Sequence, residues 1–372
     1  MKQKILFISL LGFVLLVMVD PTGNIFHLKN DGFVLILLIS CLIGKVSISR
    51  KIFIHPCLIF AFAFLSILTG GLVGNYNFSD SLPYLRTLLF LLIIIPLSTQ
   101  TSRGLLTINN IVGVGLAAII IFLYFSSTMG FWDISRFYNV DEIDKTTILV
   151  SNRSFLSYSG MMFFYKSMPF LFLPLIHFIR NKNYILAILL FIPIFMGMSR
   201  TPILCALALF AYVIYTDYNI KGIKIIIGLF LSIFLIWLLL QLLNDSDQSS
   251  GDLVKFTTTF DLLSKSDVFG HGVGVLYFSK ARNIWVTNSE MTYFEIIYQY
   301  GWILGLWVIY IFFKPAVIML IKGKTQQIKD VGFSYFMYLI VSGTNPLLIN
   351  STGLYVFSFA LLYCYKNIKT LK

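Results

Sequence analysis

The sequence is poor in charged residues and in the residue types that build soluble metal or disulfide-stapled folds. Only 12% of its 372 residues are Asp, Glu, Lys or Arg, roughly half the share that is usual in soluble domains. It has four cysteines, each inside an apolar segment, and their spacing matches neither a metal site nor a disulfide framework. No polar stretch is long enough to enclose a hydrophobic core of its own. These absences exclude a separate soluble domain and a cysteine-based metal site.

Long apolar runs take the place of charge, and 58% of the residues are hydrophobic. A bilayer core of about 30 Å needs roughly 20 apolar residues per helix. We therefore predict an all-α fold: one polytopic transmembrane bundle over residues 1–372, with about 12 spans. The predicted spans are Ile5–Val19, Gly32–Val46, Ile52–Val73, Leu85–Leu97, Leu105–Phe125, Ser157–Ile179, Tyr184–Met198, Pro202–Tyr215, Ile223–Leu243, Met291–Phe313, Val331–Ile349 and Gly353–Tyr365.

The distribution of basic residues predicts the orientation of this bundle. With the N-terminus in the cytoplasm, the cytoplasmic segments hold 17 basic and two acidic residues, and the rest of the chain holds 11 basic and 14 acidic ones. That asymmetry follows the positive-inside rule. The net charge of +12 therefore indicates membrane topology and not a nucleic-acid partner. We expect a multi-pass protein of a bacterial cytoplasmic (inner) membrane with both termini in the cytoplasm.

Two long segments then lie on the external face, over residues 126–156 and 244–290. Loops of this length are uncommon in compact proteins unless they carry function or are disordered. Arg200, at the end of the predicted span Tyr184–Met198, lies on the same face. The sequence therefore predicts that the functional site faces outward.

Ionisable residues at the membrane edge are the main candidates for function, because a charge there is costly unless it is paired or used. Arg200 could hold a phosphate or diphosphate through two parallel hydrogen bonds, or it could be an interfacial anchor. Glu290 lies where a general base could take a proton from a sugar hydroxyl. Glu295 is deeper in the same predicted helix and could equally be a packing partner for an arginine or a tyrosine hydroxyl.

Further candidates lie in the predicted external segments. His271 stands in the run Gly270-His271-Gly272-Val273-Gly274, whose glycines allow a tight turn and whose N–H groups could cradle an anion. Arg86, Arg153 and Arg282 are cations that could line the path of an anionic substrate, or could simply be solvated.

Three segments carry a resemblance to the Wzy-type polysaccharide polymerases, which are related to the O-antigen ligases. Gly197-Met198-Ser199-Arg200-Thr201 is similar to the Ser-Arg that the family has at the external end of a helix. Phe269–Gly274 resembles the glycine-rich turn of its large external loop. Asn288-Ser289-Glu290, followed by Tyr293, Tyr300-Gly301 and Gly305, resembles the helix that closes this loop. The ligase branch has His-Asn where this chain has Glu290-Met291, so the chain looks like a polymerase.

The resemblance implies an inverting, metal-independent glycosyltransferase that needs no cofactor. Such an enzyme transfers a growing glycan from undecaprenyl pyrophosphate to the next lipid-linked repeat unit, making O-antigen or capsular polysaccharide. Arg200 and Glu290 are then the expected catalytic residues, and Arg86, Arg153, His271, Arg282 and Glu295 the expected substrate-binding residues. The expected partners are the lipid-linked glycan, the bilayer, a chain-length regulator and a flippase.

Three alternatives remain open from the sequence. A flippase for lipid-linked oligosaccharides also needs about a dozen spans, although it should have short loops and charges in a central cavity. An O-antigen ligase differs only in its acceptor. A membrane scaffold without turnover is the third.

Overall fold

Helices dominate the chain. The computed structural model describes residues 2–44, 46, 48–73, 78–131, 146–155, 158–217, 260–279, 284–286 and 291–368. Its α-helices are α1 (Lys2–Val19), α2 (Lys29–Ile43), α3 (Arg50–Val73), α4 (Phe78–Leu88), α5 (Ile94–Ser98), α6 (Ser102–Thr128), α7 (Phe172–Arg180), α8 (Tyr184–Met196), α9 (Arg200–Asp217), α12 (Thr292–Lys322), α13 (Gln326–Gly343) and α14 (Ser351–Asn367). Two 3-10 helices, η1 (Leu89–Ile93) and η4 (Met168–Leu171), lead into α5 and α7. Strands β1 (Ile148–Phe155) and β2 (Tyr158–Tyr165) form one antiparallel hairpin, and β3 (Tyr277–Ser279) and β4 (Ile284–Val286) form another.

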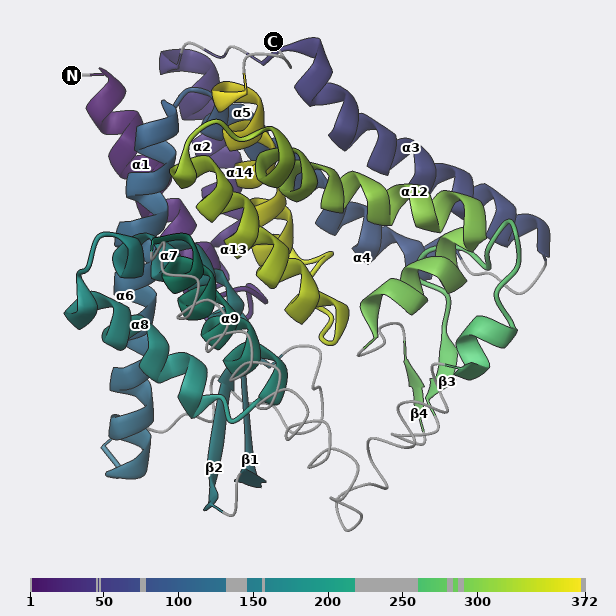
Figure 1. Ribbon diagram of the computed structural model, residues 1–372. Helices are drawn as coiled ribbons and strands as arrows, with labels where there is room; N and C mark the ends of the chain where they lie inside the picture. The colour runs from purple at the N-terminus through teal and green to yellow at the C-terminus, as the bar shows by residue number, and fades with distance from the viewer. Residues whose placement is uncertain are drawn as a thin grey trace.

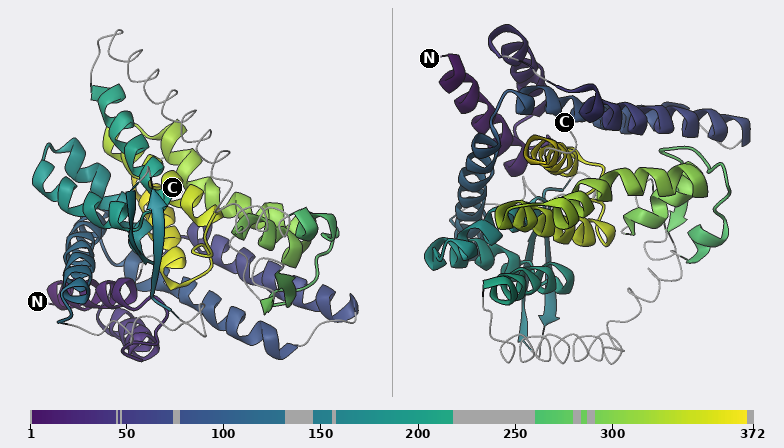
Figure 2. Two further views of the ribbon diagram at one scale, coloured as in Figure 1. Left: turned by 90° about the horizontal axis from the view of Figure 1, so that it is seen from below. Right: turned by 45° about the horizontal axis from the view of Figure 1, so that its top comes forward.

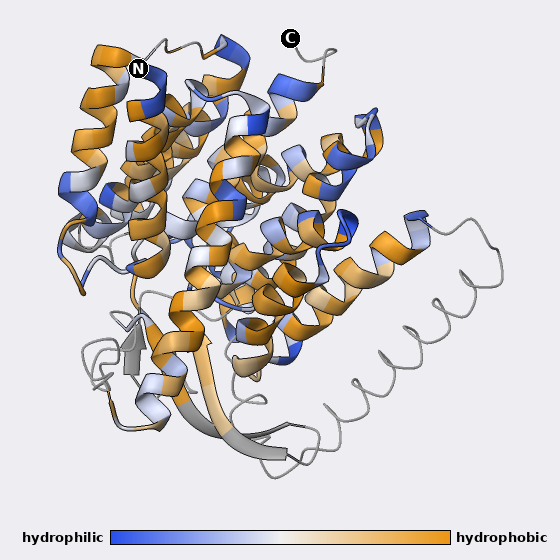
Figure 3. Ribbon diagram, turned by 90° about the vertical axis from the view of Figure 1, so that its left-hand side faces the viewer, coloured by the Kyte–Doolittle hydropathy of each residue, from blue (hydrophilic) through white to orange (hydrophobic). Residues whose placement is uncertain are grey.

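The outer faces of the helices show that this is a helical membrane protein. Within the described residues, six helical segments are long and apolar enough to cross a bilayer. Along α8, Ile185, Ile188 and Phe195 point outward with exposed fractions of 82%, 59% and 51%. Exposed apolar stripes of this kind are typical of surfaces that face lipid. Figure 3 shows hydrophobic colour along the helices and hydrophilic colour mainly at their ends.

The central helix α14 has one of its ends at each of two opposite ends of the bundle. At the first, Lys366 Nζ near the end of α14 donates to Ser98 O at the end of α5 (2.8 Å). At the second, Ser351 Oγ at the start of α14 donates to Pro21 O just after α1 (2.8 Å). Both chain termini lie at the first end, and the β1–β2 hairpin projects from the second (Figure 1). We call these the terminal end and the hairpin end.

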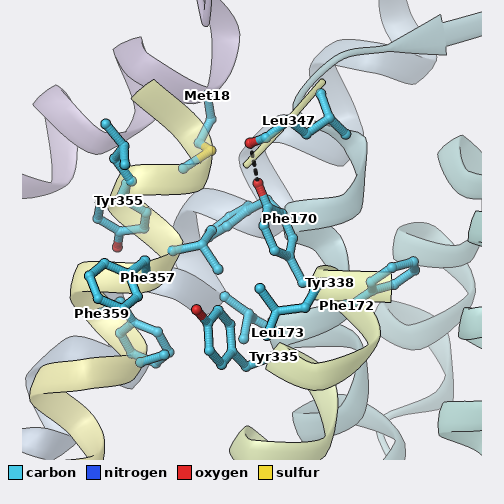
Figure 4. Packing of buried hydrophobic residues seen from close by; sticks show 14 of the residues in the cluster. Met18, Phe170, Phe172, Leu173, Tyr335, Tyr338, Leu347, Tyr355, Phe357 and Phe359 are labelled. Atoms are coloured by element: carbon cyan, nitrogen blue, oxygen red, sulfur yellow. Dashed lines mark hydrogen bonds between the residues drawn. The ribbon is translucent and has the colours of Figure 1, made fainter. Parts of the chain in front are cut away.

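Helix α14 is the centre of the bundle, since every residue from Ser351 to Tyr365 is buried. Aromatic side chains fill the space around it (Figure 4). Their polar atoms are paired: Tyr338 Oη donates to Leu347 O (3.3 Å), and Tyr335 Oη donates to Phe312 O (2.9 Å). Tyr355 Oη of α14 donates to Asn109 Oδ1 of α6 (2.5 Å). Such pairing is needed because a buried hydroxyl without a partner is costly in an apolar interior.

An ion-pair cluster joins three helices at the terminal end. The guanidinium of Arg180 on α7 donates to both carboxylate oxygens of Asp330 on α13, at 2.9 and 2.7 Å. It also pairs with Asp217 at the end of α9. The side chains of Arg180 and Asp330 are only 17% and 6% exposed, so the cluster holds α7, α9 and α13 together at this end.

The predicted span Ser157–Ile179 is wrong. Its first third is strand β2, which pairs with β1 in the register Ile148↔Tyr165. The run is rich in tyrosine, phenylalanine and methionine, and a short apolar run of this kind suits a strand as well as a helix. Strand β1 also occupies part of the segment 126–156 that the sequence indicates as a loop. The predicted span Ile223–Leu243 lies outside the described residues.

Candidate functional site

Helix α12 is sharply bent at Gly301, where the sequence predicts one continuous helix. Gly301 has φ 80° and ψ 167°, a conformation that is essentially restricted to glycine. The bend divides α12 into a short arm, residues 292–300, and a long arm, residues 302–322. The short arm folds back along the long one, since the Tyr293 and Phe313 rings are 5.6 Å apart. Figure 1 shows α12 beside α3, with the β3–β4 hairpin nearby.

The glycine-rich turn supplies hydrogen bonds to the backbone at this bend. A broken helix leaves carbonyl and N–H groups that need other partners. Tyr298 O accepts from His271 N (3.1 Å) and Gln299 O accepts from Gly272 N (3.0 Å). Trp302 N, beyond the bend, donates to Asp267 O (3.1 Å). We call this set of contacts between residues 267–272 and the bend the seam.

Helix α3 completes the seam from the other side. Ser66 Oγ donates to Gln299 O (2.8 Å), and Thr69 Oγ1 donates to Phe269 O (3.1 Å). A Cβ added at Gly70 would lie 2.6 Å from His271 O, so this position needs a glycine for the close approach of the turn. The seam therefore joins α3, the turn and α12 in one place.

This geometry changes the interpretation of the glycine-rich turn. The N–H groups of His271 and Gly272 are used for carbonyls of α12, so they do not cradle an anion. A Cβ on Gly270 would lie 2.3 Å from Gly301 N, and one on Gly301 would lie 2.3 Å from Val268 O. The glycines serve the close contact of two backbones.

A buried polar cluster lies at the bend. Glu295 of the short arm is 6% exposed and accepts from Gln299 Nε2 (2.9 Å). The Oη atoms of Tyr84 on α4 and Tyr300 are 2.8 Å apart. Both hydroxyls are within electrostatic range of the Glu295 carboxylate. An ionisable group in such a position is a functional candidate because its burial in a membrane protein is expensive.

His271 also packs against the short arm. Its ring stacks on Tyr298, with centroids 4.3 Å apart and planes at 13°, and its Nδ1 is 3.3 Å from Tyr298 O. Tyr298, Leu262 and Tyr277 form a small core of their own, separate from that of the bundle. Leu262, His271 and Tyr277 of the predicted external segment 244–290 are thus packed on the short arm.

The other five predicted site residues are Arg86, Arg153, Arg200, Arg282 and Glu290, and the structure does not bring all of them to the bend. Arg86 is exposed on α4, two residues after Tyr84. Arg200 begins α9, and α13 and α14 lie between α9 and the α3–α4 pair (Figures 1 and 2). Arg153 lies on β1, where only the backbone is described. Glu290 and Arg282 lie outside the described residues.

The sequence interpretation missed the tyrosine pair and Gln299. Gln299 had a usable signal, because it follows Glu295 by four residues and such pairs meet on a helix. Tyr84 had none, since 216 positions separate it from Tyr300. Comparison with known protein families, curated proteins and solved structures gives no match to this chain.

Proposed function

We propose that the protein is a membrane glycosyltransferase that polymerises lipid-linked oligosaccharide repeat units on the external face of a bacterial cytoplasmic membrane. The observation that carries the proposal is the bend of α12. The short arm carries a buried carboxylate, Glu295, within electrostatic range of the hydroxyls of Tyr84 on α4 and Tyr300. The three sequence segments that resemble the polymerases include both partners of the seam, the glycine-rich turn and the helix with Gly301.

The proposed reaction is one inverting displacement. The hydroxyl oxygen of the acceptor sugar attacks the anomeric carbon of the donor glycan, and a carboxylate takes the hydroxyl proton. The bond from the anomeric carbon to the diphosphate oxygen breaks, and the electron pair leaves with the diphosphate. Glu290 is the proposed base and Glu295 a positioning residue. Arg200 is proposed to hold the leaving diphosphate, because arginine binds such oxygens through two parallel hydrogen bonds.

The remaining cations have supporting roles in this proposal. Arg86, Arg153 and Arg282 would attract the anionic substrate toward the external face. The basic residues at the terminal end fit a cytoplasmic location of both termini. Twelve spans, two long external loops and partnership with a chain-length regulator and a flippase belong to the same proposal.

Transport of a lipid-linked oligosaccharide is the second candidate. The broken helix α12 favours it, because transporters often build substrate sites from helices that are interrupted within the membrane. In that case Glu295 would bind a substrate or a coupling ion at the break.

Surface polysaccharide from a deletion strain separates these candidates. We expect deletion to collapse a polymer ladder to a single-repeat band, because polymerisation alone is lost. The wild-type gene and the surface control Lys265→Ala should restore the ladder, while Arg200→Ala, Glu290→Gln and Glu295→Gln should not, at equal protein levels in the membrane. Loss of even the single repeat on deletion would overturn the polymerase in favour of export. A normal ladder with Arg200→Ala would refute the role of Arg200.

A further inference from the structure

A lateral groove between α3 and α4 has a chemistry that the bend does not explain. It has a volume of about 680 Å³, within the range of roughly 300–1,000 Å³ that is usual for small-molecule sites. Phe60, Ala61 and Phe64 of α3 form one wall. Leu82, Leu85 and Arg86 of α4 form the other.

Arg86 is the one charged residue among those that line this groove. The groove runs between two helical segments that are long and apolar enough to span a membrane. Phe64 and Leu82 are 56% and 52% exposed, so the groove opens sideways, toward the region that lipid chains occupy. An apolar trough with one guanidinium fits a molecule with a long hydrocarbon chain and an anionic head.

A second cation lies near Arg86. Lys29 stands at the start of α2, three residues before the apolar run that begins at Gly32. Burial lowers the pKa of Lys29 to about 8; the Asp20 carboxylate opposes this shift, and the positive charge of Arg86 adds to it. Two cations within electrostatic range of each other disfavour one another, and an anion held near both would relieve that repulsion.

The groove also leads to the bend. Tyr84 lies on α4 between the groove residues Leu82 and Leu85, and its hydroxyl contacts Tyr300. On α3, Phe64 of the groove wall is two residues before Ser66 of the seam. On both α3 and α4, residues that line the groove are therefore neighbours in sequence of residues that contact the bend.

We propose that the α3–α4 groove binds the isoprenoid chain of a polyprenyl phosphate or diphosphate, with Arg86 at its phosphate. The groove and its charge point to an anionic lipid, and the choice of an isoprenoid chain rests on the proposed function. The groove would hold the lipid of the acceptor repeat unit, so that its sugars extend toward the bend from the side of the membrane, while the diphosphate of the donor stays with Arg200.

Photolabelling of the purified full-length protein in nanodiscs tests this site. Two probes carry the same diazirine on the same isoprenoid chain: a polyprenyl phosphate and the uncharged polyprenol. We expect the phosphate probe to label peptides from 50–73 and 78–98. Ala61→Trp should fill the groove and lower labelling by both probes about tenfold, which corresponds to roughly 1.4 kcal/mol. Ala118→Trp is the matched control, since Ala118 is an exposed alanine on α6, and it should label like wild type.

Arg86→Gln separates charge recognition from packing. It should weaken labelling by the phosphate probe about tenfold and leave polyprenol labelling unchanged, whereas a structural role would lower both equally. Equal labelling of Ala61→Trp and Ala118→Trp would overturn the groove. Competition by phosphatidylglycerol as strong as by unlabelled polyprenyl phosphate would also overturn it, because the groove would then hold bulk lipid.

The outcomes for groove and function are distinguishable. Labelling is measured on purified protein and needs no polymer synthesis. If the groove is labelled but deletion of the gene removes even the single repeat, the lipid site is supported and the polymerase is refuted. A normal ladder with unlabelled protein would refute the groove alone.

Discussion

Replacing Gly301 by alanine should open the seam. The backbone at this position has φ 80° and ψ 167°, which costs a residue with a side chain about 1–3 kcal/mol. The new Cβ would also lie 2.3 Å from Val268 O and 2.5 Å from Gly270 N. These neighbours are backbone atoms, so they cannot move aside as the end of a flexible side chain can.

The cost of this change follows from the bonds that would be lost. Three backbone hydrogen bonds cross the seam, those from His271 N, Gly272 N and Trp302 N. Each contributes roughly 1 kcal/mol net. With the strain, Gly301→Ala should lower the free energy of unfolding by about 4–6 kcal/mol, which is a large fraction of the total stability of a protein.

The assay is an unfolding titration in mixed detergent and SDS micelles, followed by tryptophan fluorescence. Two neighbouring glycines of α3 give a matched pair of controls. A Cβ on Gly70 would lie 2.6 Å from His271 O, whereas one on Gly71 meets nothing within 4 Å. Gly70→Ala should therefore destabilise the protein and Gly71→Ala should not. Gly301→Ala unfolding within about 0.5 kcal/mol of Gly71→Ala would refute the seam, since surface substitutions alone vary by that much.

Three further predictions concern other parts of the molecule. Arg180→Met should lower the free energy of unfolding by about 3–5 kcal/mol, because it leaves the Asp330 carboxylate buried without its cation. In the same titration, the double variant with Asp330→Leu should recover most of this stability. A double variant less stable than Arg180→Met alone would contradict the pairing. Tyr355→Phe should cost about 1–3 kcal/mol by removing the donor to Asn109, and Asn109→Leu in the same chain should reduce that cost; strictly additive losses would argue against the bond. Labelling by the polyprenyl phosphate probe should fall as the pH rises from 7 to 9.5, because burial lowers the pKa of Lys29 to about 8 and its ammonium group loses its charge above pH 8. Lys29→Gln should remove this pH dependence. A Lys29→Gln variant that keeps the pH dependence would exclude Lys29 as its source.

Apolar runs predict much of the bundle, because a membrane span is a property of local composition. The predicted spans Ile5–Val19, Ile52–Val73 and Leu105–Phe125 correspond to α1, α3 and α6. The helical membrane fold is confirmed in this sense. The prediction from composition was wrong at β2. An aromatic run of this kind suits a strand as well as a helix, and its pairing with β1 is what makes it a strand.

The bend could not be predicted by the same reasoning. A single glycine within an apolar helix is tolerated, and Gly305, four residues after Gly301, remains helical. What distinguishes Gly301 is the approach of residues 267–270 and of Ser66, which are remote in sequence. The resemblance did group the glycine-rich turn with the helix of Gly301, and the structure puts the two in contact, with the N–H groups of His271 and Gly272 donating to carbonyls of α12.

The seam also has a consequence for biosynthesis. Ser66 and its acceptor Gln299 are 233 residues apart, and ribosomes add about 5–20 residues per second. At those rates roughly 12–47 s pass between the synthesis of α3 and that of its partner. Throughout that interval the last turns of α3 lie in the membrane with Ser66 and Gly70 facing neighbours other than their final ones. Insertion factors or lipids have to occupy that face, and slowing translation between the two segments would lengthen the time during which α3 can be degraded or pair wrongly.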